Sequence, residues 1–152
     1  APNNPYNVEK SNFERMNFMS VCVVIKDFRT LKVWQKANSL EHEIGKLVKG
    51  FPNHEQYRLV DQIIRSSRSI SANIAEGNTQ LFIKRELFHA NAALGSCGET
   101  RNHLLTAYQN NYISKEQFKI LDEKFLELIK MLYGYIKSLK SNLDNESDAA
   151  EP

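Results

Sequence analysis

Apolar residues recur at every third or fourth position through the C-terminal third of the chain, which is the spacing of one face of an α-helix. This stripe consists of Phe118, Leu121, Phe125, Leu128, Leu132, Tyr135 and Leu139. Ser114 and Gln117 stand before it with the spacing of a capping box, in which each side chain bonds the backbone of the other residue. The pattern predicts a long helix from about residue 114 that packs against neighbouring helices.

Three earlier segments of the chain show the same helical spacing of apolar residues. They cover residues 29–49, 55–76 and 82–110. The chain has 152 residues but only 6 Gly and 4 Pro, which argues against a turn-rich all-β fold. Four long helices joined by short loops predict an all-α fold, an antiparallel up-down-up-down four-helix bundle over residues 27–142.

Small side chains gather in the second and third segments. The second contains Ser66, Ser67, Ser69 and Ser71. Serine is a mediocre helix former, so this stretch needs a closely packed neighbouring helix to hold it. In the third segment Gly95 and Gly98 each cost about 1 kcal/mol relative to Ala in a helix, and we expect a close helix crossing or a kink there. Gly77 and Asn78 are expected to cap the second helix.

The two ends of the chain differ from the bundle in composition. Residues 1–26 begin with two prolines and two asparagines and are expected to form a flexible N-terminal leader. Residues 143–152 carry four acidic residues and no basic one, which predicts a disordered acidic tail. The longest apolar run, Val21 to Ile25, is far shorter than the roughly 20 residues that span a bilayer. With two cysteines and no disulfide framework, we expect a cytoplasmic protein without a membrane partner.

The sequence shows no recognisable catalytic signature. Its four histidines are scattered, and His89 and His103 lie about four helical turns apart. There is no nucleophile elbow, phosphate-binding glycine loop or dinucleotide fingerprint. Cys97 lies among small residues within a helical segment, which indicates a buried structural thiol. We therefore expect a protein that is not an enzyme, with no catalytic residues, no metal and no cofactor.

Basic residues are distributed unevenly along the chain. The whole chain has a net charge of +2, whereas residues 27–142 hold 17 Lys+Arg and 12 Asp+Glu, a net charge of +5. Arg58, Arg65 and Arg68 share one helix face, and Lys84 and Arg85 open the third segment. These five side chains are candidates for neutralising the phosphates of a nucleic acid. A solvated polar face with ordinary ion pairs is the alternative interpretation, and the sequence leaves both open.

Three bulky residues are candidates for packing or for a subunit interface. Trp34 is expected to anchor the core or a subunit contact rather than to stack on a base. Tyr133 and Ile136 widen the apolar stripe of the fourth segment. That helix is therefore expected to contact two neighbours or a partner subunit.

Several short motifs resemble a known family. Val-Trp-Gln-Lys-Ala occupies residues 33–37, Ala-Asn-Ile-Ala-Glu-Gly residues 72–77, and Ala-Leu-Gly-Ser residues 93–96. With these motifs, residues 26–140 are similar to the four-helix-bundle proteins encoded by intervening sequences within bacterial 23S ribosomal RNA genes. One departure is Ser71, where the family often has Pro, so the second helix is expected to be less kinked near its end.

The resemblance implies a compact helical bundle that assembles into a ring, typically a homopentamer. Relatives of the family include the accessory protein of diversity-generating retroelements, which resembles a basic ring that binds nucleic acid and a reverse transcriptase. The resemblance implies no catalytic residues.

Two functional hypotheses follow, and they belong to different classes. The first is a non-enzymatic homo-oligomeric bundle that binds RNA or a ribonucleoprotein through its basic face. The alternative is a structural protein–protein assembly module, including a reverse-transcriptase accessory role, without direct contact to nucleic acid. A small enzyme within the bundle would require inward-facing polar clusters that the spacing does not predict.

Overall fold

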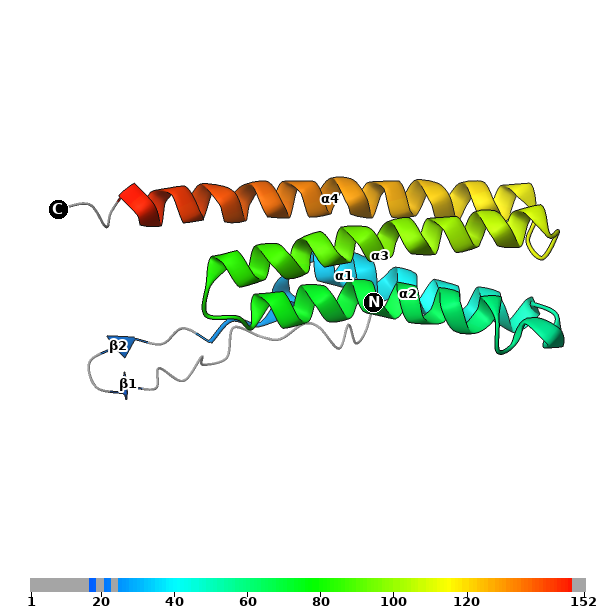
Figure 1. Cartoon of the computed structure of the whole chain (residues 1–152), viewed down its shortest axis with the longest axis horizontal. Coiled ribbons are helices and arrows are strands. Elements are labelled where there is room, and N and C mark those ends of the chain that lie inside the picture. Colours follow the sequence, from blue (N-terminus) through cyan, green and yellow to red (C-terminus); the bar gives the residue numbers. More distant parts are fainter. Residues whose placement is uncertain (1–16, 19–20, 23–24, 149–152) are drawn as a thin grey trace, which may run out of the picture.

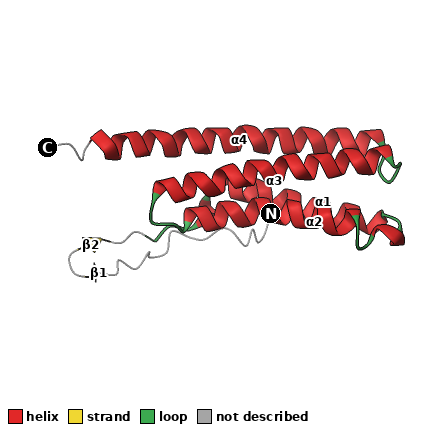
Figure 2. Cartoon of the chain, in the orientation of Figure 1, coloured by secondary structure: helices red, strands yellow, loops and turns green. Residues whose placement is uncertain are grey.

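The computed structural model describes residues 17–18, 21–22 and 25–148, and most of them belong to four helices (Figures 1 and 2). The helices are α1 (Lys32–Leu47), α2 (Leu59–Asn78), α3 (Ile83–Gln109) and α4 (Lys115–Asp148). Short 3₁₀ turns flank α1 and precede α2: η1 (Phe28–Thr30), η2 (Val48–Gly50) and η3 (Asn53–Glu55). Consecutive helices run side by side in opposite directions, which confirms the predicted all-α up-down-up-down four-helix bundle.

The predicted stripe of α4 lies in the core. Leu121, Phe125, Leu128 and Leu132 are all buried, and they pack with apolar residues of the other three helices. The capping box before the helix is confirmed, because the Ser114 amide donates to Gln117 Oε1 at 2.9 Å and the Gln117 amide donates to Ser114 Oγ at 3.1 Å. The sequence therefore fixes both the start of α4 and the face that it buries.

The far end of α4 differs from the prediction. The helix runs to Asp148, six residues past the predicted end of the bundle at 142. Helix α4 thus takes in residues 143–148 of the expected tail, and residues 149–152 lie outside the described residues, so the disorder expected over 143–152 stays a prediction. Leu139 is buried and Leu143, one turn later, is half-buried. The apolar stripe thus continues beyond the point where acidic residues begin.

Part of the expected N-terminal leader is described. Strand β1 (Asn17–Phe18) pairs with β2 (Val21–Cys22) in antiparallel fashion, with Asn17 opposite Cys22. The other residues up to 24 lie outside the described residues, so the expected flexibility of the leader stays a prediction. Lys26, at its end, is joined to the bundle by an ion pair with Glu86 on α3.

The most extensive helix contact joins α2 and α3, and small polar side chains make it close. Ser66 and Thr100 are both buried, and the Thr100 hydroxyl donates to Ser66 Oγ at 2.9 Å. A second bridge joins Ser96 to Ser69 at 3.0 Å. The predicted close packing of the serine-rich stretch is confirmed. Each hydroxyl that enters this interface finds a partner, as buried polar groups require.

The glycines behave differently from the prediction. Gly95 and Gly98 are exposed, and a Cβ atom added at either would meet nothing within 4 Å, so the expectation of a close crossing there is wrong. The close approach is at Gly77, where an added Cβ would lie 2.8 Å from the Cβ of His89 and 3.2 Å from the carbonyl oxygen of Glu86. Gly77 is helical, and the C-cap of α2 is Thr79. Gly77 therefore serves packing instead of ending the helix.

Among the adjacent helix pairs, α1 and α4 make the least extensive contact, and charged side chains bridge it. Lys36 Nζ lies 2.6 Å from Glu127 Oε2, and Lys124 Nζ lies 2.7 Å from Glu43 Oε2. Exposed ion pairs of this kind contribute only about 0–1 kcal/mol each. The core of the bundle therefore depends mainly on the other three helix contacts.

Candidate functional site

Large apolar side chains are exposed where α2 turns into α3. The exposed fractions of Leu81, Phe82 and Phe88 are 89%, 72% and 65%. Fully burying a side chain such as Phe contributes about 1.5–3 kcal/mol, so leaving three of them in water forgoes a large stabilisation. Grouped exposed apolar residues on a folded chain mark an interaction surface more often than isolated ones do.

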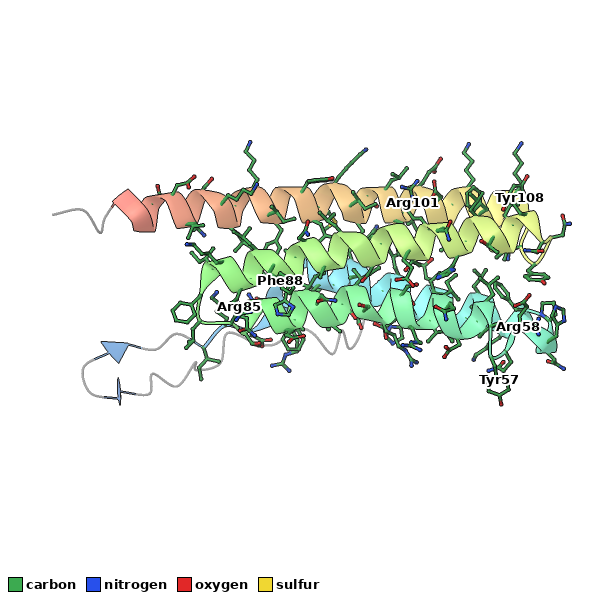
Figure 3. The ribbon with its side chains drawn as sticks, in the orientation of Figure 1. Tyr57, Arg58, Arg85, Phe88, Arg101 and Tyr108 are labelled. Carbon is green, nitrogen blue, oxygen red and sulfur yellow. The ribbon has the colours of Figure 1, made fainter. Side chains whose placement is uncertain are left out.

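Two basic side chains share this surface. Lys84 and Arg85 lie in the first turn of α3, four and three residues before Phe88, so they occupy the same helix face. Figure 3 shows Arg85 and Phe88 at the same end of the bundle. No ion pair within the described part of the chain involves either cation. We define the α2–α3 corner as Leu81, Phe82, Lys84, Arg85 and Phe88.

A buried carboxylate anchors the corner from inside. Glu86 is 2% exposed and accepts hydrogen bonds from the Tyr135 hydroxyl, from Asn78 Nδ2 at 3.2 Å and from Lys26 Nζ at 2.7 Å. Burial, followed by the hydrogen bond to Glu86, raises the pKa of Tyr135 well above its usual value, so this hydroxyl stays a donor. The cluster thus ties α2, α3, α4 and the end of the leader together directly beneath the exposed patch.

His89 completes the support of the corner. Its Nδ1 lies 3.2 Å from Asn73 Oδ1, and its Nε2 lies 3.7 Å from Glu76 Oε1, both on α2. The ring of Phe88 stands edge-on to the His89 ring, with the centroids 5.4 Å apart. Because both nitrogens of His89 face α2, the ring orientation is set by that helix. The His89 ring, itself fixed by α2, is consequently the neighbour against which the exposed Phe88 ring stands.

The remaining three predicted cations lie elsewhere. Arg58 immediately precedes α2 at the opposite end of the bundle (Figure 3), about 30 Å from the corner along the 20 residues of the helix. Arg65 lies 3.7 Å from Asp61, and Arg68 lies 3.7 Å from Glu41. The structure therefore brings together only Lys84 and Arg85 from the predicted set, while two of the others have acidic neighbours.

The predicted packing residues fall into two groups. Trp34 is buried, and its ring meets that of Phe28 edge-on with centroids 5.1 Å apart. Tyr133 is exposed on α4, and Ile136 is half-buried. Trp34 thus packs within the chain, whereas the subunit-interface role of Tyr133 and Ile136 stays a prediction.

Metal-ligating side chains are not gathered into one site in the described part of the chain. Glu86 and His89 have the Glu-x-x-His spacing known from carboxylate-bridged metal sites, but the carboxylate points to Tyr135 and the ring to Asn73. No three His, Cys, Asp or Glu residues among those described are grouped so that they could hold a metal ion. No described helix combines the length and apolar character needed to cross a membrane.

The one cysteine whose surroundings are described is inert. Cys97 is fully buried in the core, and burial raises the pKa of its thiol to about 12. Because the thiolate is the reactive form of cysteine, this group is protonated at neutral pH and unsuited to nucleophilic catalysis. The predicted structural role of Cys97 agrees with this environment.

The buried thiol leads to a prediction about alkaline stability. The folded state keeps the Cys97 proton up to about pH 12, whereas an unfolded thiol loses it near pH 9.0. Between these values the folded state binds more protons, so the free energy of unfolding should fall as pH rises. Urea unfolding at several pH values should show a slope that Cys97→Ala reduces by up to about 1.4 kcal/mol per pH unit. An unchanged slope would contradict the prediction.

Comparison with known proteins places the fold in a family. Residues 29–134 match the model of the 23S rRNA-intervening sequence protein family. The structure is similar, with a TM-score of 0.65 and 29% sequence identity, to a crystal structure from Bacteroides thetaiotaomicron described as a protein of unknown function from the S23 ribosomal protein family. That match covers 69% of this chain and 95% of the other. No curated protein matches the chain. The chain belongs to the family of 23S rRNA-intervening sequence proteins.

Proposed function

We propose that this protein is a non-enzymatic RNA-binding bundle whose α2–α3 corner holds single-stranded RNA. The observation that carries the proposal is the exposure of Phe82 and Phe88 beside Lys84 and Arg85, two cations without an ion pair in the described part of the chain. Exposed aromatic rings and basic groups at one corner of a fold are what a single strand needs, because its unstacked bases stack on the rings while its phosphates meet the cations.

Base stacking and the small number of cations both favour a single strand over a duplex. Stacking of a base on an aromatic side chain contributes about 1–3 kcal/mol per base, and a duplex keeps its bases stacked on each other. Two lysine or arginine side chains neutralise few phosphates, so electrostatics alone would give weak binding. The corner would therefore depend on its rings for affinity and on its cations for attraction. The name of the family, which refers to a 23S rRNA intervening sequence, is consistent with an RNA context.

Self-association would strengthen such a small site. The resemblance to the family implies a homopentameric ring, and α4 leaves Leu126 and Tyr133 exposed seven residues apart on its outer face. A ring would present several corners to one RNA chain, and each contact after the first would benefit from a high effective concentration. Size-exclusion chromatography with light scattering measures the assembly directly. If the protein were a monomer, each molecule would offer RNA only one weak binding site.

Binding to a labelled single-stranded RNA should show both contributions. We expect fluorescence anisotropy to give a dissociation constant that weakens as salt increases, and the Phe82→Ala/Phe88→Ala variant to bind at least about tenfold more weakly. Lys84→Gln/Arg85→Gln should lower the slope of log affinity against log salt by about 1.4, since single strands contribute about 0.7 per phosphate.

Arg58→Gln is the matched control, because Arg58 is a basic residue at the other end of α2. It should leave affinity close to that of the unmodified protein. Equal binding by all variants, or no salt-sensitive binding at all, would overturn the proposal. Retention of an acidic protein partner by the corner without RNA binding would instead support the protein-assembly alternative.

A further inference from the structure

A second site lies on another side of the bundle, in a cleft between α1 and α2. Its volume is about 310 Å³, and its lining includes Glu41, Gly45, Lys46, Lys49, Ile64 and Arg68. This volume is at the small end of the range found for small-molecule sites. Arg68 stands ten residues before the end of α2, about 15 Å along the helix from the corner. We call this site the α1–α2 cleft.

Positive charge dominates the α1–α2 cleft. Lys46 and Lys49 come from the last turn of α1 and from η2, and Arg68 comes from α2. Neither lysine has an ion pair within the described residues. Glu41 is the acidic residue of the lining, and it already accepts from the Ser71 hydroxyl at 2.7 Å and lies 3.7 Å from Arg68. Three cations thus face one carboxylate whose oxygens are already engaged.

A glycine keeps the cleft open. Gly45 lies inside α1, where glycine costs about 1 kcal/mol relative to Ala, yet an added Cβ would meet nothing within 4 Å. Packing within the chain therefore does not require glycine at this position. A side chain at 45 would instead project into space that the cleft uses. Ile64 supplies an apolar wall on the α2 side.

We propose that the α1–α2 cleft binds a phosphomonoester carried on a small organic group. A terminal phosphate bears close to two negative charges at neutral pH and accepts several charge-assisted hydrogen bonds, which matches Lys46, Lys49 and Arg68. The volume accommodates a group of about nucleotide size, and Ile64 contacts its apolar part. Two sources carry this chemistry: a free nucleoside monophosphate and the 5′-phosphate end of an RNA chain. The cleft is independent of the α2–α3 corner and does not rest on the RNA proposal.

Calorimetric titration with adenosine monophosphate tests the cleft. We expect binding of the monophosphate and none of adenosine, and a loss of affinity of at least about tenfold in Lys46→Gln/Lys49→Gln. Gly45→Leu should abolish binding by filling the cleft. Gly98→Leu is the matched control, since it also replaces a helical glycine whose added Cβ would meet nothing within 4 Å, but on α3. It should bind as the unmodified protein does.

Two further comparisons identify the source and separate the two proposals. Tighter binding of 5′-phosphorylated RNA than of 5′-hydroxyl RNA, with the difference lost in Gly45→Leu, would assign the cleft to RNA ends. Equal binding of the two RNAs, with monophosphate binding retained, would assign it to free nucleotides. Phe82→Ala/Phe88→Ala should keep monophosphate binding even if RNA binding is lost. The proposal is overturned if the monophosphate does not bind, or if Gly45→Leu and Gly98→Leu bind it equally.

Discussion

Replacing Gly77 by alanine should destabilise the bundle by about 1–3 kcal/mol, although alanine is the better helix former. The added methyl group would lie 2.8 Å from the Cβ of His89 and 3.2 Å from the Glu86 carbonyl oxygen. Both atoms are fixed by the backbone of α3, so neither can rotate away. The two helices would have to separate at their closest point, directly beneath the corner. Urea unfolding monitored by circular dichroism measures the change.

The control for Gly77→Ala is Gly98→Ala. Gly98 is also helical, but it is exposed and an added Cβ would meet nothing within 4 Å. This substitution should stabilise the protein by about 0.4–1 kcal/mol, because alanine restricts the unfolded chain and favours the helix. The two Gly→Ala changes should therefore have opposite signs. Stabilisation by both would show that α2 and α3 do not approach closely at Gly77.

Removal of the Glu86 carboxylate should be the second large effect. Glu86→Ala leaves the Tyr135 hydroxyl and Asn78 Nδ2 without the acceptor that they share, and each unsatisfied buried donor costs about 1–3 kcal/mol. The Lys26 side chain is half-exposed and its ammonium group can be hydrated instead, so the loss of its ion pair with Glu86 adds little to the destabilisation. We expect a total loss of about 2–5 kcal/mol in the free energy of unfolding, measured with urea.

Two variants calibrate this effect. Tyr135→Phe removes one hydrogen bond of the same cluster and should cost about 1 kcal/mol. Glu76→Ala removes a carboxylate that also pairs with α3 but is mostly exposed, and should cost at most about 1 kcal/mol. If Glu86→Ala were no worse than Glu76→Ala, the buried cluster would not hold the corner.

The helices of this protein can be predicted from its sequence, because apolar residues spaced three and four apart mark the helix face that is buried. The start of α4 was predictable from the Ser114–Gln117 pair, whose two hydrogen bonds are local. The end was not, because the acidic composition indicated disorder while Leu143 continued the apolar stripe. Gly77 resembles a helix cap in sequence, and only the position of His89 shows that it serves packing. Contacts between helices decide whether a glycine ends a helix or allows a neighbouring helix to approach.

The candidate site was only partly predictable. Sequence spacing shows that Arg65 can pair with Asp61 one turn earlier, but nothing local shows that Glu41 approaches Arg68. The exposure of Phe82 and Phe88 was missed, because phenylalanine is buried in most proteins. A signal was available in the pair of basic residues that stands between two phenylalanines over 82–88. Tertiary structure was needed to show that these rings find no place in the core.

Ultraviolet cross-linking to a uridine-rich single-stranded RNA, followed by mass spectrometry of tryptic peptides, tests the central claim most directly. Cleavage after Arg68, Lys84, Arg85 and Arg101 separates the rings into peptides 69–84 and 86–101. We predict cross-links at Phe82 in the first peptide and at Phe88 in the second, diminished by added salt and lost in Phe82→Ala/Phe88→Ala. Cross-links confined to Tyr57 at the opposite end of the bundle, or to α4, would contradict RNA binding at the α2–α3 corner, as would the absence of any cross-link.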